Sequence, residues 1–132
     1  MKYIKLFENF KSRDILEQFC KDNLAYIIDA GYIFQIIDDD MSENLKQICI
    51  LNKKGLSFDI QDIIYDLIPF LIELNNKYTL HPYSDNLDSD EKVYISYYSD
   101  PYSNEYISIS ELDSIKEHRK VEFIEVLVEN II

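Results

Sequence analysis

Residues 59–78, DIQDIIYDLIPFLIELNNKY, contain the longest series of apolar side chains at helical spacing in the chain. The spacing of three and four places these side chains on one face of a helix, which other segments must cover. Asp59 is positioned to cap the first turn, and Pro69 removes one backbone donor inside the helix. The expected core positions are Ile60, Ile63, Ile64, Leu67, Leu71, Leu74 and Tyr78.

A second apolar group on the same helix consists of Tyr65, Ile68 and Ile72. These residues widen the apolar surface beyond a single face. We therefore expect a helix that is either buried on more than one side or presents a second face to a partner.

The segment before this helix predicts a helix and two strands. Ser12 is a suitable N-cap for a helix over residues 13–30, and Gly31 stands where a helix commonly ends in a left-handed residue. Residues 32–37 and 45–52 are rich in β-branched and aromatic side chains, which is typical of strands.

The segment after it predicts more strands. Residues 92–99 and 106–109 fit two strands joined by a turn, and Ser110 fits the N-cap of a short helix over residues 111–118. Residues 121–128, VEFIEVLV, fit either a last strand or a helical face, and we favour the strand.

Together these elements predict an α+β fold with the order α-β-β-α-β-β-β. Two main helices would pack on one face of a mainly antiparallel sheet, with a short helix before the last strand. We assign residues 1–11 to an N-terminal arm or address peptide and residues 12–132 to a single domain.

The net charge of −12 is the one compositional extreme. Residues 1–60 carry a net charge of −2 and residues 61–132 carry −10, so the acidity is concentrated in the second half. An acidic surface opposes direct binding to nucleic acid or to an anionic membrane, whereas it favours a basic protein partner.

The N-terminal peptide, MKYIKLFENF, alternates basic and apolar residues. It resembles a peptide of the form MK, Tyr or His, IKLFE, any residue, Phe, at the start of small uncharacterised proteins of tailed bacteriophages. It is also similar to the capsid-targeting peptides of large myoviruses. The resemblance covers ten residues and implies a phage origin; the expected address residues are Tyr3, Ile4, Leu6, Phe7 and Phe10.

No pattern in the sequence predicts catalysis, a metal site or a cofactor. Residues 38–40 with Glu43 fit a solvated turn better than a cation site, and His81 and His118 lack a partner at metal-ligand spacing. Cys20 and Cys49 lie on apolar faces and read as core thiols. With short apolar runs and no secretion signal, we expect a protein of the reduced host cytoplasm.

The acidic, tyrosine-rich residues 83–106 are the better functional candidate. Tyrosine supplies stiff, amphipathic contact area and is enriched in protein interfaces, and carboxylates beside it select a basic partner. Alternatively, half of these tyrosines are core and the acids only keep the chain in solution. The expected partner-binding residues are Tyr83, Asp85, Asp88, Asp90, Glu91, Tyr94, Tyr98, Asp100 and Tyr102.

Two functions follow as hypotheses. The first is a small phage-encoded binding protein that occupies and inhibits a host protein, such as a defence or nucleic-acid-handling enzyme, through residues 83–106. The second is an internal or structural virion protein directed by residues 1–10. An enzyme is the third hypothesis and would need a pocket that gathers His81 or His118 with carboxylates.

Overall fold

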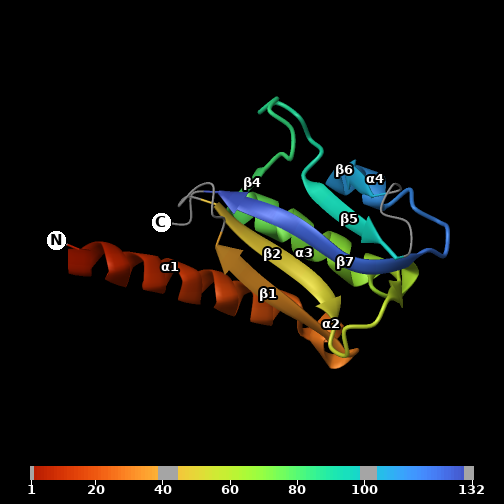
Figure 1. Cartoon of the computed structure of the whole chain (residues 1–132), viewed down its shortest axis with the longest axis horizontal. Helices are drawn as coiled ribbons and strands as arrows, with labels where there is room; N and C mark the ends of the chain where they lie inside the picture. The colour runs from red at the N-terminus through yellow and green to blue at the C-terminus, as the bar shows by residue number, and fades with distance from the viewer. Residues whose placement is uncertain (1, 39–44, 99–103, 130–132) are drawn as a thin grey trace.

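The computed structural model describes residues 2–38, 45–98 and 104–129, and it describes side chains from Arg13 onward. The centre of the fold is one antiparallel sheet with the strand order β1-β2-β7-β5-β6 (Figure 1). The short strands β3 and β4 also pair with β7, which is therefore the central strand. The strands are β1 (Tyr32–Asp38), β2 (Leu45–Asn52), β3 (Phe58–Asp59), β4 (Thr79–His81), β5 (Val93–Tyr97), β6 (Glu105–Ile107) and β7 (Lys120–Glu129).

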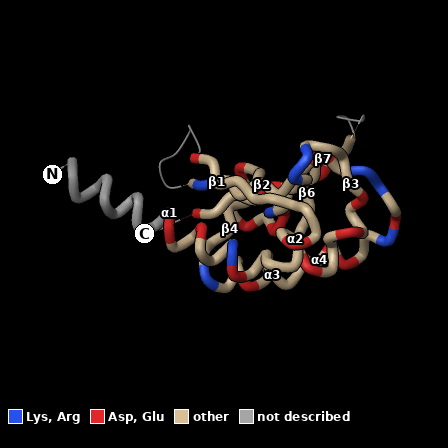
Figure 2. The backbone as a smooth tube through the Cα atoms, turned by 90° about the horizontal axis from the view of Figure 1, so that it is seen from below, with Lys and Arg blue, Asp and Glu red and all other residues tan. Residues whose placement is uncertain are grey.

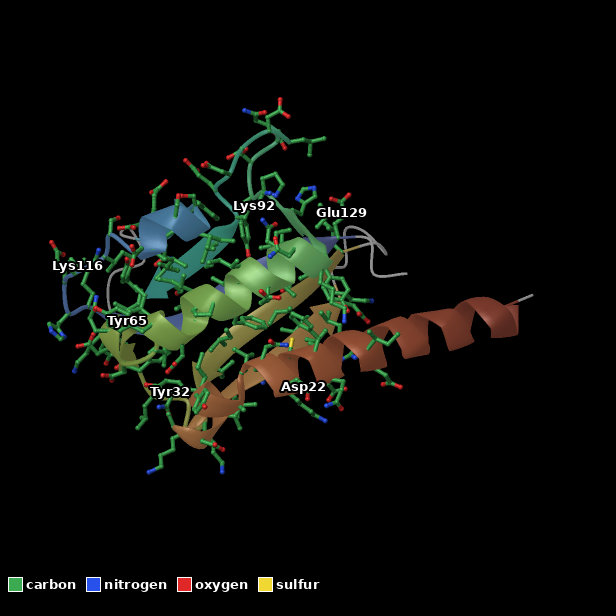
Figure 3. The ribbon with its side chains drawn as sticks, turned by 180° about the vertical axis from the view of Figure 1, so that it is seen from behind. Asp22, Tyr32, Tyr65, Lys92, Lys116 and Glu129 are labelled. Carbon is green, nitrogen blue, oxygen red and sulfur yellow. The ribbon has the colours of Figure 1, made fainter. Side chains whose placement is uncertain are left out.

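The helices pack on one face of this sheet, as Figure 3 shows from the helix side. In that view α3 lies across the sheet, between α4 and the α1–α2 pair. The fold is therefore the predicted α+β arrangement. No helix in the described part of the chain is long and apolar enough to cross a bilayer. The helices are α1 (Lys2–Asn23), α2 (Ala25–Asp29), the 3-10 turn η1 (Ile60–Asp62), α3 (Ile64–Lys77) and α4 (Ile109–Leu112).

The predicted long helix forms most of the helical side of the core. Asp59 caps the 3-10 turn η1, because its carboxylate accepts a hydrogen bond from the Gln61 amide at 2.9 Å. The α-helix α3 begins after Ile63, which makes no side-chain capping bond, and Pro69 lies inside α3. Tyr78, by contrast, is only half-buried. The other six predicted core residues are all buried: Ile60, Ile63, Ile64, Leu67, Leu71 and Leu74.

Alternation along the strands gives the sheet a covered face and an uncovered one. Ile124 of β7 pairs with Ile50 and Ile95, and all three belong to the core under the helices. Residues one position away therefore point to the other side. We call this side the open face; on the strands it includes Gln35, Cys49, Leu51, Tyr94, Tyr106, Phe123, Glu125 and Leu127.

The N-terminal half departs from the expected helix boundaries. Ser12 is not an N-cap, because α1 begins at Lys2 and runs through it; serine is tolerated inside helices. The predicted helix over 13–30 is also interrupted at Leu24, where φ is −109° and ψ is 15°. The interruption leaves both Leu24 and Ile27 buried. Gly31 has φ of +100°, which confirms the predicted left-handed end.

The C-terminal half contains one further correction. Ser108, not Ser110, caps the short helix: its Oγ accepts a hydrogen bond from the Glu111 amide at 3.2 Å, and its hydroxyl contacts the Glu111 carboxylate. Ser108 is thus an N-cap, and the Glu111 carboxylate accepts a hydrogen bond from its hydroxyl at 3.1 Å. Accordingly α4 is shorter than expected and ends at Leu112. Residues 121–128 form a strand, as favoured, and that strand is the centre of the sheet.

Candidate functional site

Four of the predicted carboxylates lie in the connection between β4 and β5, which extends beyond the sheet in Figure 1. Residues 84–91, here called the acidic loop, are shaped by local hydrogen bonds. Asn86 Oδ1 accepts from the Asp88 amide at 3.1 Å, and the Ser89 amide donates to the Asn86 carbonyl at 3.0 Å. Four exposed side chains make no ion pair within the described residues: Asp85, Asp88, Asp90 and Glu91.

Three tyrosines from separate segments meet on the open face, next to this loop. The ring centroids of Tyr83 and Tyr106 are 5.1 Å apart, those of Tyr94 and Tyr106 are 5.0 Å apart, and those of Tyr83 and Tyr94 are 5.9 Å apart. Phe123 of β7 extends this tyrosine cluster, at 5.9 Å from Tyr94. Tyr106 is 50 % exposed, whereas Tyr83 and Tyr94 are less exposed than Tyr106. The cluster is thus a packed aromatic surface in which the Tyr106 ring is exposed to solvent.

Glu125 lies at the base of the cluster, in the middle of β7. The Tyr83 hydroxyl donates a hydrogen bond to its Oε1 at 3.1 Å. Burial, together with the nearby Glu125 carboxylate, raises the pKa of Tyr83 far above that of a free phenol. The same two causes raise the pKa of the neighbouring Cys49 thiol to about 11. Both groups are therefore neutral near pH 7, and neither is prepared to act as a nucleophile.

The surroundings of the open face are acidic. Figure 2 shows the strands and the helices as two layers, with acidic positions along both. On β7 itself the carboxylates are Glu122, Glu125 and Glu129, and the acidic loop adds four more. The cations nearby are fewer: Lys120 of β7, Lys92 directly after the acidic loop, and Lys53 and Lys54 in the turn after β2.

Several predicted site residues lie outside the tyrosine cluster and the acidic loop. Asp100 and Tyr102 lie outside the described residues, as do the side chains of the address peptide, Tyr3, Ile4, Leu6, Phe7 and Phe10. The backbone of that peptide belongs to helix α1. Tyr98 is 51 % exposed and lines a hollow next to the cluster.

Tyr106 belongs to the tyrosine-rich residues 83–106 but was not predicted as a site residue, and Phe123 and Glu125 were not predicted either. Their place in the cluster depends on β7 lying beside β5, in a register that pairs Tyr94 with Glu125. The sequence carries no clear signal for this, because the two glutamates of 121–128 stand three residues apart and fit a helical face as well as a strand.

The second apolar face of the central helix is exposed, so α3 is not buried on both sides. Tyr65 is 68 % exposed and Ile72 is 47 % exposed (Figure 3 labels Tyr65). A groove of about 590 Å³ runs between α3 and α4, with Ile68, Ile72 and Ile109 in its walls. This groove lies on the helical side, away from the tyrosine cluster.

The described residues contain no group of three or more His, Cys, Asp or Glu side chains able to hold a metal ion. His81 Nδ1 lies 2.7 Å from the Pro82 carbonyl oxygen, and the exposed His118 contacts Asp59 at 2.8 Å. Burial would raise the pKa of Asp59, but its bonds with the Gln61 amide and His118 outweigh that effect and lower it. These contacts hold loops together, and they do not converge on a pocket.

No protein-family model matches the chain, and neither a curated protein nor a solved structure matches it. The features that bear on function are those of the molecule itself: the open face, the tyrosine cluster and the acidic loop.

Proposed function

We propose that this chain is a small acidic binding protein, encoded by a phage, that occupies and inhibits a basic surface of a host protein. A defence or nucleic-acid-handling enzyme fits this description of the target. The contact surface consists of the tyrosine cluster and the acidic loop, together with the part of the open face between them.

One observation carries the proposal: a packed aromatic surface on the uncovered face of the sheet stands beside four carboxylates that make no ion pair within the described residues. Buried aromatic contacts supply most of the binding energy of protein interfaces, while charge complementarity sets partner choice and association rate. An unpaired, exposed carboxylate costs little in the free protein and is available to a cation of the partner.

The sign of the charge supports a protein target over a polyanion. Nucleic acid and anionic lipid are bound through Lys and Arg, which release counterions or meet phosphate groups. Around the open face, carboxylates outnumber these cations. A basic groove that normally holds nucleic acid would instead attract this surface.

The test is affinity capture from infected host cells, followed by identification of the captured proteins. We would compare the intact chain with a variant in which Asp88, Asp90 and Glu91 are changed to Lys. The proposal predicts that a basic host protein is captured by the intact chain and is lost by this variant.

A matched control separates local contact from net charge. Changing Asp14, Asp22 and Asp29 to Lys alters the charge equally, but on α1 and α2, where all three residues are exposed. The control should still capture the partner. Loss of the partner in both variants would show that only the overall charge matters. Recovery of capsid components that are lost when residues 1–10 are removed would instead favour a virion protein.

A further inference from the structure

A hollow of about 450 Å³ opens on the open face, next to the tyrosine cluster. Its floor contains Leu51 of β2 and Phe123 of β7, which also contacts Tyr94 of the cluster. Leu56 borders it from the turn after β2, and Tyr98 from the end of β5. The hollow is therefore continuous with the proposed contact surface, through the ring of Phe123.

An irregularity in β7 places a carboxylate at this hollow. Ser96 pairs with Phe123 and Tyr97 pairs with Val121, so one step on β5 corresponds to two steps on β7. Glu122 is the extra residue of a β-bulge, a feature that redirects side chains. In a regular strand, Glu122 and Phe123 would point to opposite faces, yet both line the hollow.

The turn after β2 closes the other side. Gly55 has φ of +71°, a conformation that side-chain-bearing residues rarely adopt, and its amide donates to the Asn52 carbonyl at 2.9 Å. This turn brings Leu56, which is 60 % exposed, to the border of the hollow. The result is a recess with apolar and aromatic walls and one carboxylate at its rim.

We propose that this hollow receives an arginine side chain of the basic protein partner, an inference that rests on the proposed function. The guanidinium group would meet Glu122, and it would stack on Tyr98 while its methylene stem covers Leu51 and Phe123. A planar guanidinium combines these properties, because it binds carboxylates in a fork and lies flat on aromatic rings. Within the described residues Glu122 makes no ion pair, so no intramolecular cation competes.

The test needs no knowledge of the partner. The ¹⁵N-labelled full chain is titrated with the peptide acetyl-Gly-Arg-Gly-amide, and in parallel with the same peptide carrying citrulline, which has the same shape without the charge. We expect the arginine peptide to shift the amide signals of Leu51, Leu56 and Phe123. The citrulline peptide should bind about fivefold more weakly, the modest preference of a partly exposed ion pair.

Two matched variants locate the contact. Glu122→Gln should abolish the preference for arginine over citrulline, whereas Glu129→Gln, at the far end of the same strand, should keep it. The proposal is overturned if the arginine peptide leaves the hollow unshifted, if both peptides bind equally, or if Glu122→Gln keeps the preference. If the arginine peptide does not bind the hollow, charge reversal of the acidic loop should still abolish capture of the host partner. The proposed function and the arginine site can therefore fail separately.

Discussion

Tyr83 and Glu125 are 42 residues apart in the chain, and a 3.1 Å hydrogen bond joins the Tyr83 hydroxyl to the Glu125 carboxylate on the open face. Tyr83 precedes the acidic loop, whereas Glu125 belongs to the central strand. The bond therefore fixes the base of the loop to the centre of the sheet. Tyr83 also bonds across the loop, through its amide to the Glu91 carbonyl at 3.3 Å.

Tyr83→Phe removes this bond and keeps the ring. We expect the free energy of unfolding to fall by about 1.5–3 kcal/mol, the usual net value of a hydrogen bond to a charged group. Chemical denaturation at pH 7 measures the change. Tyr98→Phe is the control, because Tyr98 is 51 % exposed and its hydroxyl makes no hydrogen bond within the residues that the structure describes; equal effects of the two changes would contradict the role given to Tyr83.

The contact between His118 and Asp59 predicts that the stability of the fold depends on pH in the acidic range. Because the pKa of Asp59 is lower in the fold than in the unfolded chain, its contribution to stability is present above the ordinary Asp value of about 3.9 and is lost as pH falls through the folded-state pKa. His118→Ala should raise the pKa of Asp59, as measured by NMR titration of its carboxyl carbon. The pKa of Asp38, lowered mainly by its bond with Lys46, should stay unchanged; a shift of both or of neither would contradict this assignment.

Both thiols should resist modification in the folded protein. Cys20 is fully buried and Cys49 is 8 % exposed, and burial is the main cause that raises their pKa values, to about 12 and about 11. Reaction with a thiol reagent at pH 8 should therefore be slow until denaturant is added, after which both cysteines react. The single-cysteine variant Cys20→Ala shows whether Cys49 by itself reacts slowly in the folded protein. Rapid reaction of Cys49 without denaturant would contradict its burial.

Side chains on the two faces of α3 should contribute differently to the free energy of unfolding. Leu67 is fully buried, so Leu67→Ala should lower the free energy of unfolding by about 2–5 kcal/mol. Ile72 is 47 % exposed in the groove wall, and Ile72→Ala should cost roughly 0.5 kcal/mol or less. Denaturant midpoints measure both changes, and a large loss at Ile72 would indicate that the groove is covered in solution.

The sequence predicted the elements better than their contacts. The apolar side chains in residues 59–78 recur at helical spacing because they are buried on one face. The buried positions from Ile60 to Leu74 could therefore be predicted without the structure. The two-residue strand β3 and the three-residue strand β4 could not, because segments of that length carry no periodic signal. The caps at Ser12 and Ser110 were wrong because serine also occurs within helices.

The candidate site was predicted only in part, for a similar reason. Tyr83 and Tyr94 belong to one tyrosine-rich segment, whose composition is visible in the sequence. Their meeting with Phe123 and Glu125 depends on strand order and register, which are long-range properties. The bulge that turns Glu122 towards the hollow is a local irregularity of that same pairing.

Footprinting of the captured complex with hydroxyl radicals tests the central claim most directly, because exposed tyrosines lie on both sides of the molecule. Tyr98 and Tyr106 line the open face and are 51 % and 50 % exposed, whereas Tyr26 and Tyr65 on the helices are 80 % and 68 % exposed. Binding through the open face predicts that Tyr98 and Tyr106 are oxidised more slowly in the complex, while Tyr26 and Tyr65 react as in the free protein. Protection of Tyr26 and Tyr65 with Tyr98 and Tyr106 unchanged would contradict the account and place the partner on the helices.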